Sequence, residues 1–245
     1  MNLSPTAPKP AVPLVDVLLR IRQDMRERKT GPYQYIGMPY VHWMRCFVDG
    51  YGECLRLLGV EEGADLLFGE WLRDVKKAWP GQGWDHAYLE EFEGDHSRAL
   101  LKYLDFVAEF RELPPEALAA IVCFHKGEHP AARRPSLVPT QPPTPTLDYL
   151  LEIRREVGDV EGRLGLFIGY IEVERMAGFI DGYRLCLALA GARDEEYARF
   201  ERWLHEARGL PAGQTWPAVY LAACQGNAEQ AIRRLLEDVA LFRGV

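Results

Sequence analysis

Apolar residues recur at every third or fourth position over most of the chain, which is the spacing of one face of a helix. The clearest run is Val41, Met44, Phe47, Tyr51, Cys54, Leu55 and Leu58, with His42, Arg45, Asp49, Glu53 and Arg56 on the opposite face. The pattern predicts an amphipathic helix over 40–58 and further helices over 14–28, 62–77, 84–92 and 96–111.

The same pattern returns 132 positions later (176 minus 44), where MRCFVDGYGECLRLLG at 44–59 is matched by MAGFIDGYRLCLALAG at 176–191. Residues 13–113 align with 145–245 without a gap, and about a third of the positions are identical. A repeat of this length indicates two copies of one fold. The predicted fold class is all-α, with two homologous helical-bundle repeats of about 100 residues related by internal duplication.

These features divide the chain into four parts: a proline-rich segment 1–12, helical repeat 13–113, a short helix and proline-rich linker 114–144, and helical repeat 145–245. Proline-rich linkers are extended spacers, so this one does not fix how the repeats are arranged. If the repeats pack together, we expect a pseudo-two-fold arrangement, in a monomer or a further homodimer.

Polar residues and glycines shared by the two copies are predicted to be structural: Arg22, Asp49, Gly50 and Tyr51, and their counterparts Arg154, Asp181, Gly182 and Tyr183. A glycine within a helix costs about 1 kcal/mol relative to alanine, so its presence in both copies predicts a closely crossing helix. We also expect Arg22 to pair with Asp49 between adjacent helices, and Arg154 to pair with Asp181 in the same way.

The composition does not change the predicted fold, but the net charge indicates which class of binding partner to expect. Hydrophobic residues make up 48% of the chain, charged residues 27%, and the net charge is −7, with acidic residues in excess in both repeats. An acidic surface disfavours nucleic acid and anionic membranes and favours a basic protein. The first residues, MNLSPTAPKPAVP, do not resemble a secretion signal, so a cytoplasmic location is expected. The five cysteines show no C-x-x-C spacing that would suggest zinc.

Histidines are the main candidates for chemistry. HKGEH at 125–129 fits the H-x-x-E-H pattern, but Gly127 and the following Pro130 argue against the continuous helix that this motif needs, and a linker is expected. His42, His86 and His96 lie in the first repeat and could converge, yet no histidine is matched by another in the second repeat. We therefore predict no catalytic residue, no metal site and no cofactor.

The two repeats differ most around residues 79–96. The first repeat carries two tryptophans and an acidic run, which are the predicted binding residues: Trp79, Trp84, Glu90, Glu91, Glu93 and Asp95. Tryptophan beside acids is typical of an interface anchor with a charged rim. The alternative is that the acids are only solvated, while AVYLAAC at 218–224 is buried between the copies.

Two segments, LLRIRQDMRERKTGPYQYIGMPYVHWMRCFVDGY and LLEIRREVGDVEGRLGLFIGYIEVERMAGFIDGY, resemble a short bacterial all-helical family. Its members have a first helix, a glycine-aromatic-isoleucine-glycine turn, and a helix ending in an F-x-x-G-Y box. Some members resemble toxin immunity proteins, and the family supplies no catalytic residues. The first copy departs from the family in its turn, GPYQYIG.

Charge and resemblance together predict a non-enzymatic protein-binding module, immunity-like, that neutralises a basic toxin by occluding it with an acidic face. One alternative is a structural or regulatory scaffold acting through its duplicated repeats, which predicts an exposed apolar patch. Another is a histidine-dependent hydrolase or metal enzyme, which requires His42, His86 and His96 to converge.

Overall fold

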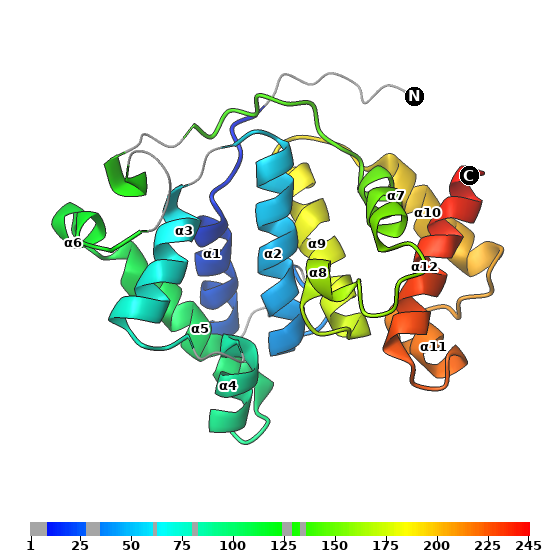
Figure 1. Cartoon of the computed structure of the whole chain (residues 1–245), viewed down its shortest axis with the longest axis horizontal. Helices are drawn as coiled ribbons and strands as arrows, with labels where there is room; N and C mark the ends of the chain where they lie inside the picture. Colours follow the sequence, from blue (N-terminus) through cyan, green and yellow to red (C-terminus); the bar gives the residue numbers. More distant parts are fainter. Residues whose placement is uncertain (1–8, 28–34, 61–62, 80–82, 124–128, 133–135) are drawn as a thin grey trace.

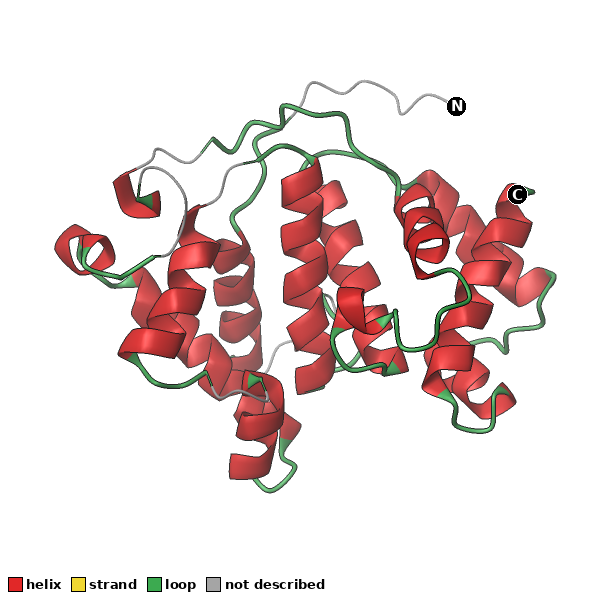
Figure 2. Ribbon diagram, in the orientation of Figure 1, coloured by secondary structure: helices red, strands yellow, loops and turns green. Residues whose placement is uncertain are grey.

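A computed structural model describes residues 9–27, 35–60, 63–79, 83–123, 129–132 and 136–245. Its regular elements are all helices, and the described residues form no strand (Figure 2). The all-α prediction is therefore confirmed. None of the described helices is long and apolar enough to cross a membrane.

The described residues of the first half, 13–113, form the α-helices α1 (Leu14–Arg26), α2 (Val41–Leu57), α3 (Gly63–Glu70), α4 (Trp84–Glu91) and α5 (His96–Arg111). The chain continues from α3 into a π-helical turn, Trp71–Val75, so the single helix expected over 62–77 changes its geometry midway. The start of α5 is fixed by Asp95, whose carboxylate accepts a hydrogen bond from the backbone N–H of Arg98 at 3.0 Å.

The second half, residues 145–245, contains α7 (Thr146–Val157), α8 (Gly165–Ile168), α9 (Val173–Leu189), α10 (Glu195–Glu206), α11 (Trp216–Ala223) and α12 (Ala228–Arg243). Both bounds of α9, α11 and α12 lie 132 residues after those of α2, α4 and α5 (173 minus 41, 216 minus 84, 228 minus 96). Between the halves are α6 (Pro115–Ala119) and a 3-10 turn, Pro130–Ala132.

Helices α2 and α9 form the centre of the molecule, with α1, α3, α4 and α5 on one side and α7, α10, α11 and α12 on the other (Figure 1). A Cβ atom on Gly50 would overlap the backbone carbonyl of Phe179, and one on Gly182 would overlap that of Phe47. The expectation of a closely crossing helix at these glycines is confirmed, because only glycine leaves the backbones this close.

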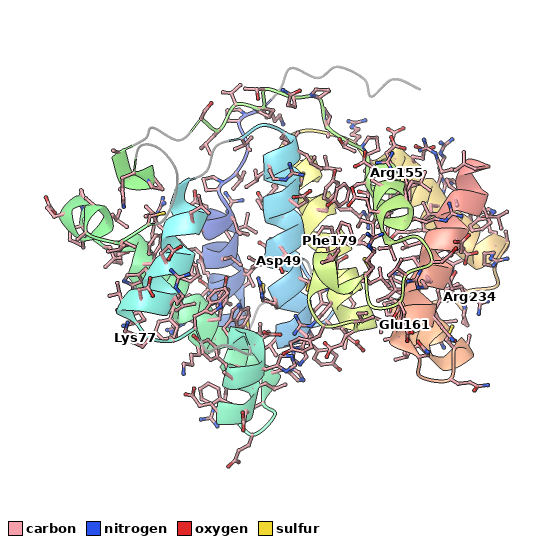
Figure 3. The ribbon with its side chains drawn as sticks, in the orientation of Figure 1. Asp49, Lys77, Arg155, Glu161, Phe179 and Arg234 are labelled. Atoms are coloured by element: carbon pink, nitrogen blue, oxygen red, sulfur yellow. The ribbon has the colours of Figure 1, made fainter. Side chains whose placement is uncertain are left out.

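The contacts between α2 and α9 are reciprocal. Gly50 meets Phe179, and Gly182 meets Phe47, the residue 132 positions before Phe179 (179 minus 47). Asp49 on α2 and Phe179 on α9 are labelled in Figure 3. Trp43 contacts Gly178, and four residues further along each helix Phe47 contacts Gly182. Because the residue numbers increase together, α2 and α9 run in the same direction. Buried apolar residues of both halves join in one core across this crossing.

The predicted pairing of Arg22 with Asp49, and of Arg154 with Asp181, is wrong. Arg22 Nε donates to Asp105 of α5 at 2.7 Å, and Arg154 Nε donates to Glu237 of α12 at 2.9 Å. The reason is packing: α1 lies mainly against α5, and α7 mainly against α12, so these arginines face the last helix of their own half.

The two aspartates have other partners. Arg45 donates to Asp49 one helical turn away, at 2.5 Å. Asp181 accepts hydrogen bonds from Gly37 N at 3.0 Å and from Trp43 Nε1 at 2.7 Å, both in the first half. Burial raises the pKa of both carboxyl groups above the ordinary value, although these bonds oppose the shift.

Backbone hydrogen bonds hold the connector against the N-terminal segment and the first half. Ala11 N donates to Leu137 O at 2.7 Å, while Thr140 N and Gln141 N both donate to Leu58 O at the end of α2. The shared tyrosines fix the chain before each first helix, since Tyr51 donates to Val12 O at 2.7 Å and Tyr183 to Thr144 O at 3.0 Å. Their structural role is as predicted.

Candidate functional site

The two predicted tryptophan anchors lie inside the protein or against its own side chains. Trp84 is fully buried and stacks on Tyr103 with ring centroids 3.9 Å apart, so its prediction as an interface anchor is wrong. It begins α4, and the helix turns its side chain into the core of the first half. Trp79 is half-buried, with the Arg45 guanidinium 5.5 Å from its ring.

The acidic run is exposed, as an interface rim requires. Glu90, Glu91, Glu93 and Asp95 all lie at the surface around the end of α4 and the turn into α5. Glu91 pairs with Lys102, and Asp95 caps α5. The alternative, in which 218–224 is buried between the halves, is wrong because Ala218, Ala222 and Ala223 are exposed on α11.

Glu90 and Glu93 line an open hollow of about 600 Å³. Its remaining lining residues are His86, Leu89 and Gly94 from the first half and Tyr170 from the second. Tyr170 is 53% exposed, and its ring meets the His86 ring edge-on at 4.7 Å. The hollow therefore combines two carboxylates with two aromatic rings, at a place where both halves contribute.

Behind this hollow, the three histidines of the first half converge. The ring centroid of His42 lies 4.6 Å from that of His86 and 6.3 Å from that of His96. Each histidine stands in the first turn of its helix, α2, α4 or α5. The histidine-dependent alternative requires these side chains to converge in a pocket; the rings lie near one another, but of the three His86 alone lines the hollow, so that alternative stays an untested prediction.

A buried ion pair from the two halves lies next to these rings. Asp85 of α4 is 1% exposed and Arg175 of α9 is 3% exposed, and the Arg175 guanidinium bonds directly to Asp85 Oδ2. The same guanidinium lies 3.1 Å from His86 Nε2 and 3.3 Å from His42 Nδ1, and its Nε donates to Glu172 at 3.0 Å. Its carbon is also 5.2 Å from the centre of the Tyr170 ring.

Burial, hydrogen bonds and neighbouring charges shift the pKa values of Asp85, His96 and Cys46 in this cluster. Burial raises the pKa of Asp85, but the hydrogen bond from His42 at 2.9 Å and the charge of Arg175 outweigh it, so the pKa is lowered overall. Burial and the neighbouring His42 lower the pKa of His96. Burial raises the pKa of the Cys46 thiol, near Arg175, to about 12, which leaves it a poor nucleophile.

His42, Asp85 and His86 offer three nitrogen and oxygen atoms within 4.8 Å of one another, a spacing that could suit a metal ion. The Arg175 guanidinium contacts all three atoms, so the protein's own cation already lies among them. We therefore assign these residues as partners of Arg175. The chemistry open to the His42–Asp85 pair is proton transfer, because the carboxylate orients the imidazole ring.

Sequence reasoning missed Arg175 and Tyr170. The signal was present, because Arg175 stands where the first repeat has Trp43 (175 minus 132) and so breaks the match in the first turn of α9. Of the HKGEH segment only His129 is described, and its ring bonds to Ile121 O at 2.8 Å within the connector. Residues 125–128 lie outside the described residues.

Comparison of the chain with protein-family models, with curated proteins and with solved structures finds no match in any of the three. The resemblance to a short bacterial helical family therefore stays a prediction.

Proposed function

We propose that this protein is a non-enzymatic binding module for a basic protein, and that the partner inserts a cationic side chain into the hollow between Glu90, Glu93 and Tyr170. The observation that carries the proposal is the hollow itself, where two exposed carboxylates and an exposed aromatic ring face one open space. A cation is attracted both by carboxylates and by the face of an aromatic ring.

The whole-molecule charge supports the same partner. A net charge of −7 increases the rate at which a basic protein encounters this surface, and the effect weakens with salt. In its more specific form, the proposal is that the protein is immunity-like and blocks a basic toxin by occlusion. We also infer that the two halves arose by duplication, on the strength of their shared residues and matching helix bounds. A scaffold role remains the alternative prediction.

The test is a charge reversal confined to the hollow. Glu90→Lys with Glu93→Lys changes the net charge by four units while leaving the Asp95 cap of α5 and the Glu91–Lys102 pair intact. The matched control is Glu161→Lys with Glu206→Lys, which makes the same change at two exposed sites of the second half. Binding of a hexalysine peptide is measured by calorimetry at low and high salt, followed by affinity capture from the native lysate.

We expect the hollow variant to weaken hexalysine binding at least tenfold and the control variant to weaken it less than threefold, since long-range attraction through water is largely screened. A basic protein captured by the control and released by the hollow variant would then be co-expressed, to see whether the binding module relieves its toxicity. Equal weakening by both variants would mean that only net charge matters, and the proposal would be wrong.

A further inference from the structure

His86 occupies a position in which its protonation state matters to both halves. Its Nε2 atom lies 3.1 Å from the terminal nitrogen of Arg175, and its ring packs against Tyr170. A guanidinium has only donors, so His86 Nε2 must accept the hydrogen bond and must carry no proton. A proton on that atom would remove the acceptor and place two cations against each other.

The neighbouring histidines differ in this respect. His42 Nδ1 lies 2.9 Å from the carboxylate of Asp85, which only accepts, so we assign the proton to Nδ1. The 3.3 Å contact of the same atom with Arg175 then joins two donors and is no hydrogen bond, so a second proton on the His42 ring breaks neither contact. His96 Nδ1 lies 3.4 Å from Val41 N, a contact within the first half. His86 is therefore the histidine whose protonation breaks a bond between the halves.

Other charges around His86 act in both directions. Arg175 opposes a second proton on its ring, and His42 of α2 adds to that when it is charged. Asp85, Glu90 and Glu93 favour the proton, but Asp85 is already paired with Arg175, and the other two are exposed and screened by water. Glu172 is paired with Arg175 Nε at 3.0 Å. Tyr170 meets the ring by its edge.

We propose that His86 is a proton-controlled latch between the two halves. When neutral, it accepts the hydrogen bond from the buried Arg175 and holds Tyr170 at the wall of the hollow. When protonated, it no longer accepts from Arg175, which stays paired with Asp85 and Glu172, and it frees Tyr170. It also adds a positive charge to the hollow, which then binds a cationic group less well. Imidazole side chains generally change charge between about pH 5 and 8, which is the range that the test covers. The effect on binding rests on the proposed function, whereas the release of the segment does not.

The test measures the latch without any ligand. Hydrogen exchange of the backbone amides of residues 169–176 is followed at pH 7.5 and 6.0 in the wild type, in His86→Gln and in His205→Gln, with rates corrected for intrinsic exchange. A glutamine oxygen can accept the bond from Arg175 but does not titrate, and His205 is a remote histidine of α10. We expect acidification to accelerate exchange about tenfold in the wild type and in His205→Gln, and not in His86→Gln.

The latch is overturned if the wild type shows no acceleration, or if His86→Gln accelerates as the wild type does. Should His86→Gln fail to fold, the wild type alone decides by nuclear magnetic resonance. The titration midpoint of the His86 ring must then coincide with that of the Tyr170 and Arg175 amides, and separate midpoints reject the latch. Hexalysine binding is measured at both pH values in parallel. No binding at either pH counts against the proposed function and leaves the exchange result to be judged by itself.

Discussion

Trp79 and Trp84 are five positions apart, yet they have different surroundings and different roles. Trp84 lies flat on Tyr103 inside the first half, and among the described residues its indole N–H has no hydrogen-bond partner. Trp79 is partly exposed beneath Arg45. The residue type alone suggested a common interface role for both. Trp84 begins α4, whereas Trp79 lies in the irregular segment after the π-helical turn, and the residue type alone does not reveal which of these segments points into the core.

Trp84→Ala should lower the free energy of unfolding by about 3–5 kcal/mol, because a large buried side chain is replaced by a cavity. Trp79→Ala should cost clearly less, since much of that side chain's surface already meets water. Urea unfolding followed by circular dichroism gives both values. Equal losses from the two substitutions would show that Trp79 is as deeply packed as Trp84.

Helix α2 shows how one element can carry two glycines with opposite effects. Gly50 faces α9, where any side chain would overlap the Phe179 carbonyl, whereas none of the described residues lies within 4 Å of the position of a Cβ on Gly52. The position of α2 itself was predictable, because its apolar spacing continues for several turns. The ion-pair partner of Arg22 could not be predicted, because apolar periodicity identifies the buried face of a helix but not the neighbouring helix that its polar residues contact.

Gly50→Ala should therefore destabilise the protein by about 1–3 kcal/mol or more, as overpacking does, because α2 and α9 must separate. Gly52→Ala, two residues along the same helix, should stabilise it by up to about 1 kcal/mol, since alanine favours a helix more than glycine. Thermal or urea unfolding of the two variants, measured side by side, compares them directly. A stabilising Gly50→Ala would contradict the close crossing.

At the scale of the whole molecule, the candidate site belongs to neither half alone. His42, Asp85 and His86 come from the first half, and Tyr170 and Arg175 come from the second. The positions 132 residues away in the other half hold Glu174, Pro217, Ala218, Met38 and Trp43, so the described residues contain this set of side chains once. Residues that are identical at positions 132 apart identify the core, but they do not identify this site, because its residues differ between the two halves. The order of the helices could be predicted from the apolar spacing. The contact between the site residues of the two halves could not, because it depends on how α2 packs on α9.

The Asp85–Arg175 pair should also govern acid stability. The pKa of Asp85 is lowered in the folded protein, so its contribution is complete above the ordinary aspartate pKa of about 3.9 and is lost as the pH falls through the folded value. Asp49 and Asp181 act in the opposite sense, because burial raises their pKa values and their stabilising effect falls as the pH rises from about 3.9.

Comparison with Asp85→Asn isolates the Asp85 contribution. We expect this variant to be less stable than the wild type by about 3–5 kcal/mol at pH 7, where it leaves Arg175 without its buried partner charge. The difference should shrink as the pH falls below about 4, because the carboxyl then takes up a proton in the unfolded chain before it does so in the folded protein. Urea unfolding across this range measures it. A difference that stays constant with pH would show that the ion pair does not contribute to acid stability.

The reciprocal contact between α2 and α9 has a consequence for assembly. Each helix contributes a glycine and a phenylalanine carbonyl at equivalent positions, Gly50 and Phe47 on α2 and Gly182 and Phe179 on α9. The surface that joins the halves within one chain could therefore equally join the first half of one chain to the second half of another. What favours closure within one chain is the high local concentration that the tether, residues 114–144, provides. The length of this tether thus decides between a self-contained fold and an exchange of halves among neighbouring chains.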